Sequence, residues 1–185
     1  MNRQFLMIAL LCCLSAVARP ATIASGWEKM LKDRLSEFLS CKDQADDASP
    51  CNRFIGKALE DVYGVDDFQD PSTKGQYLSA NLIDTYLSVS NDWVVLGTAD
   101  QQQALNDAAG AANAGHAVVA VIPGVNHGHV ALVIPGDLTY SPSWKLNVPN
   151  SASFFLGNPA QSYVGDKLSK AFSSPADVRL FARSH

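Results

Sequence analysis

Two kinds of residue are scarce in this sequence, and each scarcity narrows the functional classes. Lysine and arginine number 14 against 18 acidic residues. A nucleic-acid partner calls for a basic surface, so this class is disfavoured. Only four cysteines occur, and two of them, Cys12 and Cys13, lie in an N-terminal apolar run. The remaining pair, Cys41 and Cys51, is compatible with either one disulfide or one reactive thiol.

The apolar run near the N-terminus is too short to span a bilayer easily. Residues 5–18 (FLMIALLCCLSAVA) follow Arg3 and give 14 residues without charge. This pattern is typical of a secretory signal peptide, with Ala16-Val17-Ala18 or Thr22-Ile23-Ala24 preceding the cleavage point. An N-terminal membrane anchor is the alternative.

We expect residues 1–24 to be a signal peptide and residues 25–185 to be a single secreted or periplasmic domain. Removal of Arg3 and Arg19 leaves 12 basic against 18 acidic residues, a net charge of −6.

Hydrophobic periodicity predicts a helical first half and a strand-rich second half. Apolar spacing and capping residues predict four helices: 27–39, Ser49 to Gly64, 79–89, and a Thr98–Gln101 capping box to about Ala114. β-Branched apolar runs predict five strands: 116–122, 129–134, 138–141, 152–156 and 178–182. Residues 164–172 are expected to form a short helix. We therefore expect an α+β fold in which the helix carrying Cys51 packs on an antiparallel sheet of about five strands.

Cys51 follows Ser49 and Pro50 at a predicted helix start, where a thiol can become a nucleophile. The free backbone N–H groups and the dipole of a helix N-terminus stabilise a thiolate. A nearby imidazole would accept the proton of the thiol. The best source is His129, which begins the predicted strand GHVALV.

A third polar group should orient the imidazole and fix its tautomer. We expect it on the next strand or turn; Asn147 is the first choice, and Ser141, Ser143 and Asn150 are alternatives. Two further residues are candidate substrate-binding groups. Asn52 could hold a substrate carbonyl, and Trp144 could form one wall of a substrate groove.

Two other interpretations remain open. A Cys41–Cys51 disulfide could staple a non-enzymatic secreted module, or it could hold an enzyme inactive until it is reduced. Alternatively, His127 and His129 point to the same side of a strand and could share a zinc ion. Ala120 stands where a further ligand of such a site would be needed, so the zinc pattern fails.

The residues Cys51-Asn52-Arg53-Phe54-Ile55, followed downstream by Gly128-His129-Val130-Ala131-Leu132-Val133, resemble the NlpC/P60 and CHAP group of papain-like cysteine peptidases. The resemblance covers about residues 45–145. It implies a secreted cysteine amidase or endopeptidase that hydrolyses amide bonds of bacterial peptidoglycan through a thioester, without cofactor or metal. The partners it implies are the peptidoglycan stem peptide and, for amidase toxins of this fold, an immunity or inhibitor protein. The gap of 78 residues between Cys51 and His129 is long for compact members of the group.

Overall fold

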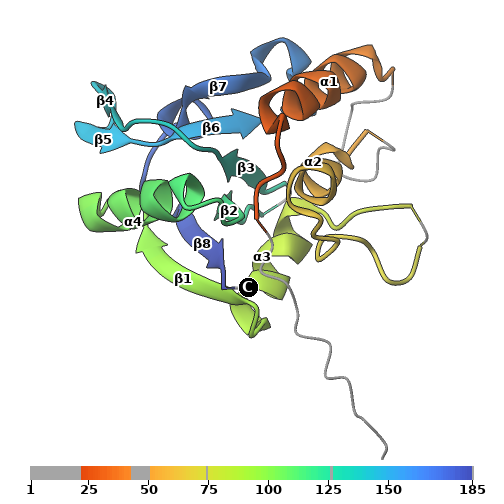
Figure 1. Cartoon of the computed structure of the whole chain (residues 1–185), viewed down its shortest axis with the longest axis horizontal. Helices are drawn as coiled ribbons and strands as arrows, with labels where there is room; N and C mark the ends of the chain where they lie inside the picture. The colour runs from red at the N-terminus through yellow and green to blue at the C-terminus, as the bar shows by residue number, and fades with distance from the viewer. Residues whose placement is uncertain (1–21, 43–50, 74, 126, 185) are drawn as a thin grey trace, which may run out of the picture.

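A computed structural model describes residues 22–42, 51–73, 75–125 and 127–184, so residues 1–21 of the expected signal peptide lie outside it. The fold is α+β, with one antiparallel sheet of six strands between helices (Figure 1). Within the described ranges, no helix combines the length and apolar character needed to cross a membrane.

Four α-helices confirm the helical first half: α1 Trp27–Ser40, α2 Phe54–Tyr63, α3 Ala80–Val89 and α4 Gln102–Asn113. The Ser79 hydroxyl caps α3 by accepting a hydrogen bond from the Leu82 N–H. Gly64 ends α2 at a positive φ of 67°, as its position in the sequence predicts. The predicted capping box of α4 is wrong, because Gln101 is the N-cap and makes no side-chain cap bond.

The start of α2 also differs from the prediction. Arg53 is its N-cap, so Cys51 and Asn52 lie in a turn before the helix rather than in its first turn. The expected caps Ser49 and Pro50 lie outside the described residues. A disulfide joins Cys51 to Cys41 at the end of α1, with their Cα atoms 6.1 Å apart. This bond holds the backbone of Cys51 against the end of α1, and the helix starts only after it.

The sheet has the strand order β1-β8-β2-β3-β6-β7. Its strands are β1 Trp93–Thr98, β2 Val118–Ile122, β3 His129–Val133, β6 Asn150–Ser153, β7 Tyr163–Lys167 and β8 Arg179–Arg183. The predicted hairpin is confirmed as β2 and β3, in which Ile122 pairs with His129. The sequence did not predict β1, and the short helix expected over 164–172 is instead β7 followed by the 3₁₀ turn η2 Leu168–Lys170.

A separate two-stranded hairpin, β4 Thr139–Ser141 and β5 Leu146–Val148, stands apart from the large sheet. Residues 138–141, which the sequence predicts as the next strand after 129–134, therefore do not join the large sheet. On the side away from β2, the strand that pairs with β3 is β6, with Ala131 opposite Ser153. The 3₁₀ turn η1 Pro159–Gln161 then connects β6 to β7. This connectivity decides which polar side chains lie beside His129.

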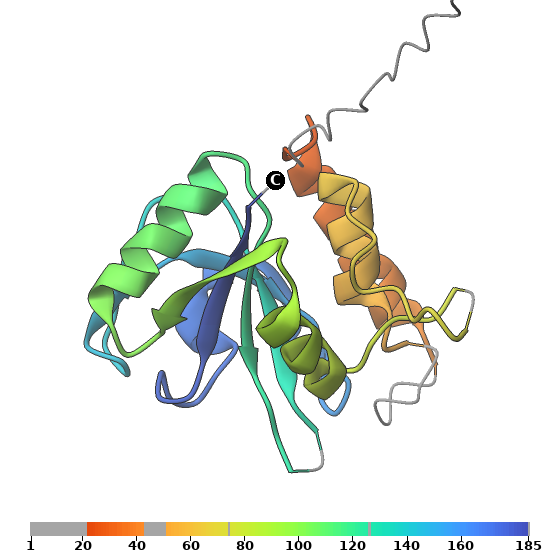
Figure 2. The ribbon, with the colours of Figure 1, turned by 90° about the horizontal axis from the view of Figure 1, so that it is seen from below.

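Helices cover the two faces of the sheet unequally (Figure 2). Helices α1, α2 and α3 pack on one face, where the rings of Phe38 and Phe54 lie 5.2 Å apart and those of Phe38 and Phe154 lie 5.6 Å apart. Helix α4 and the β4–β5 hairpin cover the other face. Gly97 lets β1 approach α4 closely there, because a Cβ at this position would lie 2.9 Å from the Ala104 methyl.

Residues 22–24 are part of the folded domain. The Ile23 N–H donates to the Gly115 carbonyl at 2.8 Å, and the Ala24 N–H donates to the Val62 carbonyl at 2.7 Å. Ile23 also packs against the core under α1 and α2. Of the two predicted cleavage points, the one after Ala18 retains these contacts, whereas the one after Ala24 removes them.

Candidate functional site

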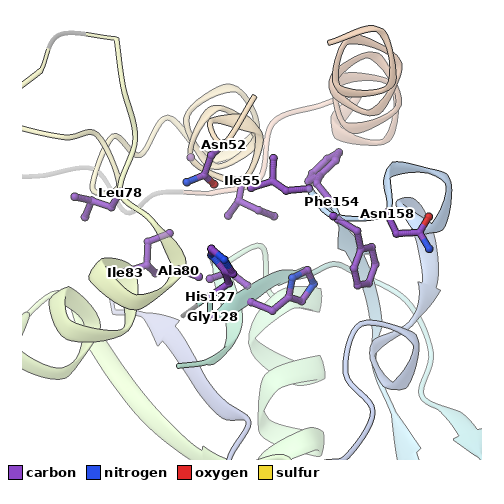
Figure 3. A pocket seen from close by; sticks show the side chains of 15 residues that line it. Asn52, Ile55, Leu78, Ala80, Ile83, His127, Gly128, Phe154 and Asn158 are labelled. Carbon is purple, nitrogen blue, oxygen red and sulfur yellow. The ribbon is translucent and has the colours of Figure 1, made fainter. Parts of the chain in front are cut away.

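A cleft of about 360 Å³ opens between the start of α2 and the start of β3. One wall comes from the segment that follows Cys51, and the opposite wall comes from the β2–β3 turn and the first residues of β3 (Figure 3). Figure 3 shows Asn52 and Ile55 on the helix side, with His127 and Gly128 facing them. The lining residues are Asn52, Ile55, Gly56, Leu78, Ala80, Ile83, residues 127–130 and residues 154–158.

His129 is the first residue of β3 and lines this cleft. Its Nε2 lies 2.7 Å from the Ser153 hydroxyl, a short hydrogen bond. The ring stacks on Phe155 at 4.5 Å between centroids and meets Phe172 edge-on at 5.4 Å. These three contacts fix the orientation of the imidazole, and the Ser153 hydroxyl occupies its Nε2.

Burial lowers the pKa of His129 from 6.5 to about 4. The cause is loss of hydration around the ring, which disfavours its charged form. The imidazole is therefore neutral at pH 7, and its low pKa makes it a weak base in the bridged form of the protein. A neutral ring also supplies no positive charge to stabilise a thiolate in advance.

The polar side chain that bonds the His129 ring is Ser153, on β6, and not Asn147, which was the first choice for the orienting residue. Asn147 lies on β5, where its backbone exchanges two hydrogen bonds of 2.9 Å with the Gln102 side chain. The alternatives Ser141 and Ser143 bond each other, 3.1 Å apart. Asn150 pairs with Lys167 at the outer end of β6. Among the described residues, none of these four forms a hydrogen bond with the His129 ring.

Ser153 was missed because the sequence places β4 after β3 along the chain, whereas the sheet places β6 beside β3. Its side chain is fully buried. Ser153 falls within the predicted strand 152–156. A serine on a strand that pairs with the strand of His129 is the signal that could have identified it. The required step was to pair that strand with β3 rather than to follow the order of the chain.

Cys51 is oxidised and buried in this structure. Its sulfur is bonded to Cys41, and the residue is 1% exposed, within the apolar cluster under α1 and α2. Strand alternation directs Val130 and Leu132 toward that cluster and Ala131 and Val133 toward α4. His129 lies two residues before Ala131, so its side chain also points to the α4 side of the sheet. It shares a cleft with the segment after Cys51 only because the cleft extends around the end of the sheet.

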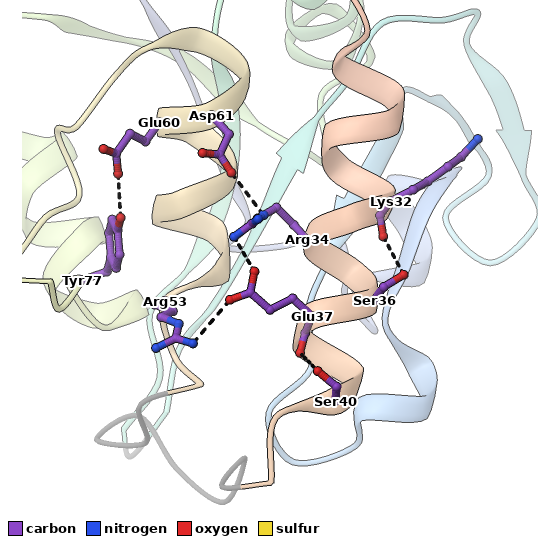
Figure 4. Close-up of polar contacts among 9 residues, drawn as sticks. All are labelled: Lys32, Arg34, Ser36, Glu37, Ser40, Arg53, Glu60, Asp61 and Tyr77. Carbon is purple, nitrogen blue, oxygen red and sulfur yellow. Dashed lines mark hydrogen bonds and ion pairs between the residues drawn. The ribbon is translucent and has the colours of Figure 1, made fainter.

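Ion pairs hold the start of α2 against α1 independently of the disulfide (Figure 4). Arg34 on α1 bonds Glu37 at 2.5 Å and reaches Asp61 on α2 at 3.1 Å. Arg53, two residues after Cys51, lies 3.4 Å from Glu37. These side chains are partly exposed, so each pair contributes little alone. Together with the disulfide, the pairs Arg34–Asp61 and Arg53–Glu37 join α2 to α1 at two places along the helix.

Helix α3 positions the turn that leads into His129. The Asn81 side chain donates to the Gly124 carbonyl at 2.9 Å and accepts from the Gly124 N–H at 3.0 Å. This two-point contact anchors the β2–β3 turn against α3. His127 in that turn is exposed, whereas His129 is half-buried.

Trp144 does not reach the cleft. It lies in the turn of the β4–β5 hairpin, is 7% exposed, and belongs to the apolar cluster on the α4 face. Asn52, the other expected substrate-binding residue, does line the cleft. Across the residues that the structure describes, no group of three or more His, Cys, Asp or Glu side chains could hold a metal ion.

Comparison with protein-family models and with curated protein sequences finds no match to this chain. The class defined by fold and site is thus an α+β domain with a histidine-lined cleft beside a disulfide.

Proposed function

We propose that this chain is a secreted, thiol-dependent amidase of papain-like architecture, which resembles the NlpC/P60 and CHAP group and acts on peptidoglycan peptides. The bridged form is its resting state. Cys51 is the nucleophile after reduction, His129 is the base, and Ser153 positions the imidazole.

One observation carries this proposal: a single cleft is lined by the residue after Cys51 and by His129 from the opposite wall. A nucleophile and a base from distant parts of a chain must converge on one cavity to act on one substrate. The volume of about 360 Å³ suits a short peptide segment.

Activation begins with reduction of the disulfide. Cys41 is half-buried while Cys51 is buried, so an external thiolate attacks the Cys41 sulfur and expels Cys51 as a thiolate. A second thiol resolves the mixed disulfide on Cys41. The freed Cys51 side chain then turns about its χ1 bond toward the cleft.

Acyl transfer then proceeds within the cleft. His129 Nδ1 takes the proton of Cys51 as the sulfur attacks the substrate carbonyl, and the Asn52 side-chain amide donates to the oxygen that becomes negative. The carbon–nitrogen bond breaks, and the leaving amine takes the proton from His129. Water, deprotonated by the same imidazole, hydrolyses the thioester and restores the thiol.

A second candidate is a non-enzymatic secreted module stapled by the disulfide, and the observed bond favours it. A bridge that closes a ten-residue separation stabilises a fold by about 2–3 kcal/mol. Both candidates predict this stabilisation, so stability alone does not separate them.

The test is hydrolysis of purified muropeptides, read by mass, with and without dithiothreitol. We expect the wild-type protein to be active only with reductant. Cys41→Ser and Cys51→Ser form a matched pair, because each removes the same bridge. Cys41→Ser should be active without reductant, whereas Cys51→Ser should lose at least about 10³-fold under either condition. Equal inactivity of both variants and of the reduced wild type would favour the stapled module.

A further inference from the structure

A second groove adjoins His129. It has a volume of about 340 Å³ and shares His129 and Phe155 with the cleft described above. The first cavity extends from His129 to Asn52, while the second extends from His129 to the loop after η2. Its lining residues are Ile122, His129, Phe155, Ala171, Phe172, Ser173 and Ser174.

The chemistry of this groove favours an uncharged, apolar group. Ile122, Phe155, Ala171 and Phe172 form its walls, and two serine hydroxyls stand at its rim. None of the described lining residues carries a charged side chain at neutral pH, because His129 is neutral there. A charged side chain placed here would lose hydration without gaining a partner.

The position of the groove identifies which part of a substrate it would meet. During acyl transfer the carbonyl fragment stays bonded to sulfur, on the side of Asn52 and Ile55. The leaving amine must lie against the imidazole, because His129 gives it the proton. A cavity that touches the imidazole but not the Cys51 segment is therefore placed for the amine fragment.

We propose that the groove formed by Ile122, Phe155 and Phe172 is a subsite for an apolar side chain on the amine side of the scissile amide bond. This inference rests on the proposed amidase function. A subsite of this kind makes the enzyme selective for amide bonds whose amine belongs to an apolar residue. It disfavours amide bonds whose amine belongs to an acidic residue.

Binding can be tested without catalysis on the bridged wild-type mature protein. The probes are L-leucinamide and L-glutamic acid α-amide, which resemble the amine product. The readout is the His129 ring signal in a ¹H–¹³C spectrum, assigned by its loss in His129→Gln. We expect a saturable shift with leucinamide and a dissociation constant at least about tenfold higher for the glutamic acid amide. Equal binding of the two amides would overturn the proposal.

Two surface substitutions provide matched variants for the same titration. Ser173 and Ala176 are both exposed in the loop before β8, but Ser173 lines the groove and Ala176 does not. Ser173→Trp should fill the groove and weaken leucinamide binding at least about tenfold, whereas Ala176→Trp should leave it unchanged. An unchanged affinity in Ser173→Trp would contradict the subsite.

Acyl transfer to added amines then separates this inference from the proposed function. With reduced protein and muropeptides, leucinamide should intercept the thioester more effectively than glutamic acid α-amide. Leucinamide binding without any hydrolysis would overturn the amidase and uphold the groove as an apolar binding site. Hydrolysis without any preference among the amines would uphold the amidase and overturn the subsite.

Discussion

The two faces of the sheet are packed by helices whose buried side chains differ in size. On the α4 face, Ala104, Ala108 and Ala112 are buried and let the helix lie close to the strands. The α1–α3 face is packed by larger aromatic residues and leaves a cleft at the start of β3. Small residues let helix α4 pack directly against the strands. The helices that meet near the start of β3 leave space between them, and this space is the cleft.

His129 lies at the boundary between these two regions. Its ring points to the α4 side of the sheet, but its place at the end of β3 also exposes it to the cleft. If the chemistry belongs to this boundary, substitutions at His129 should affect activity most, and substitutions on helix α4 should affect stability alone.

The largest expected effect is on activity and concerns two histidines, His127 in the β2–β3 turn and His129 at the start of β3. In the Cys41→Ser background, His129→Ala should lower kcat/KM by about 10³-fold, because the base is lost. His127→Ala should lower it by less than about tenfold, since His127 is an exposed residue of the cleft wall and the hydrogen bond to Ser153 is made by His129. The measurement is the rate of muropeptide cleavage by each purified variant. Equal losses would contradict the assignment of His129 as the base.

The next effect is on stability and depends on pH. The pKa of His129 is about 4 in the folded protein and about 6.5 when unfolded. Between these values the unfolded state binds more protons, so the stabilisation is complete above pH 6.5 and is lost as pH falls toward 4. The loss amounts to at most about 3 kcal/mol. Urea unfolding across this range should show this slope in wild type and a reduced slope in His129→Gln; identical slopes would refute it.

A smaller loss of activity should follow removal of the Ser153 hydroxyl. Ser153→Ala frees the Nε2 side of His129, so we expect kcat/KM to fall by about 10- to 100-fold. Ser151→Ala is the control, because Ser151 is equally buried on the same strand but bonds Tyr163 at 2.8 Å. Both variants should lose about 1 kcal/mol of unfolding free energy. If Ser151→Ala lowers kcat/KM as much as Ser153→Ala does, the loss reflects stability rather than positioning.

The last comparison concerns stability alone and takes one helical glycine from each side of the sheet. A Cβ at Gly56 of α2 would lie 2.1 Å from the Tyr77 ring, which a 2.6 Å hydrogen bond to Glu60 holds in place. Gly56→Ala should therefore destabilise the protein by about 1–3 kcal/mol and alter the cleft wall. Gly110 of α4 has no such neighbour, so Gly110→Ala should stabilise by about 0.5–1 kcal/mol. Thermal melts of both variants measure the difference, and equal signs would contradict the account.

Much of the fold follows from local patterns in the sequence. Apolar spacing predicts α1 and α3 to within about a residue, and the β-branched runs predict the β2–β3 hairpin with His129 at its start. These elements are determined by contacts between residues close in the chain. The position of His129 beside a cleft was predictable for the same reason.

Features that depend on distant pairing could not be predicted in this way. Ser153 lies beside His129 only because residues 139–148 form their own hairpin and leave the sheet. Strand β7 resembled a helix because the LSKAF segment follows it closely. The choice between a free and a bridged Cys51 depends on the distance to Cys41, which spacing in the sequence does not fix.

The most direct measurement is chemical trapping of the acyl group. Cys41→Ser protein is mixed with muropeptides, quenched in acid within the first turnover, digested and analysed by mass spectrometry. Our account predicts a peptide containing residue 51 with the muropeptide acyl fragment attached as a thioester, and its absence in Cys51→Ser. Product formed while Cys51 stays unmodified would contradict the account.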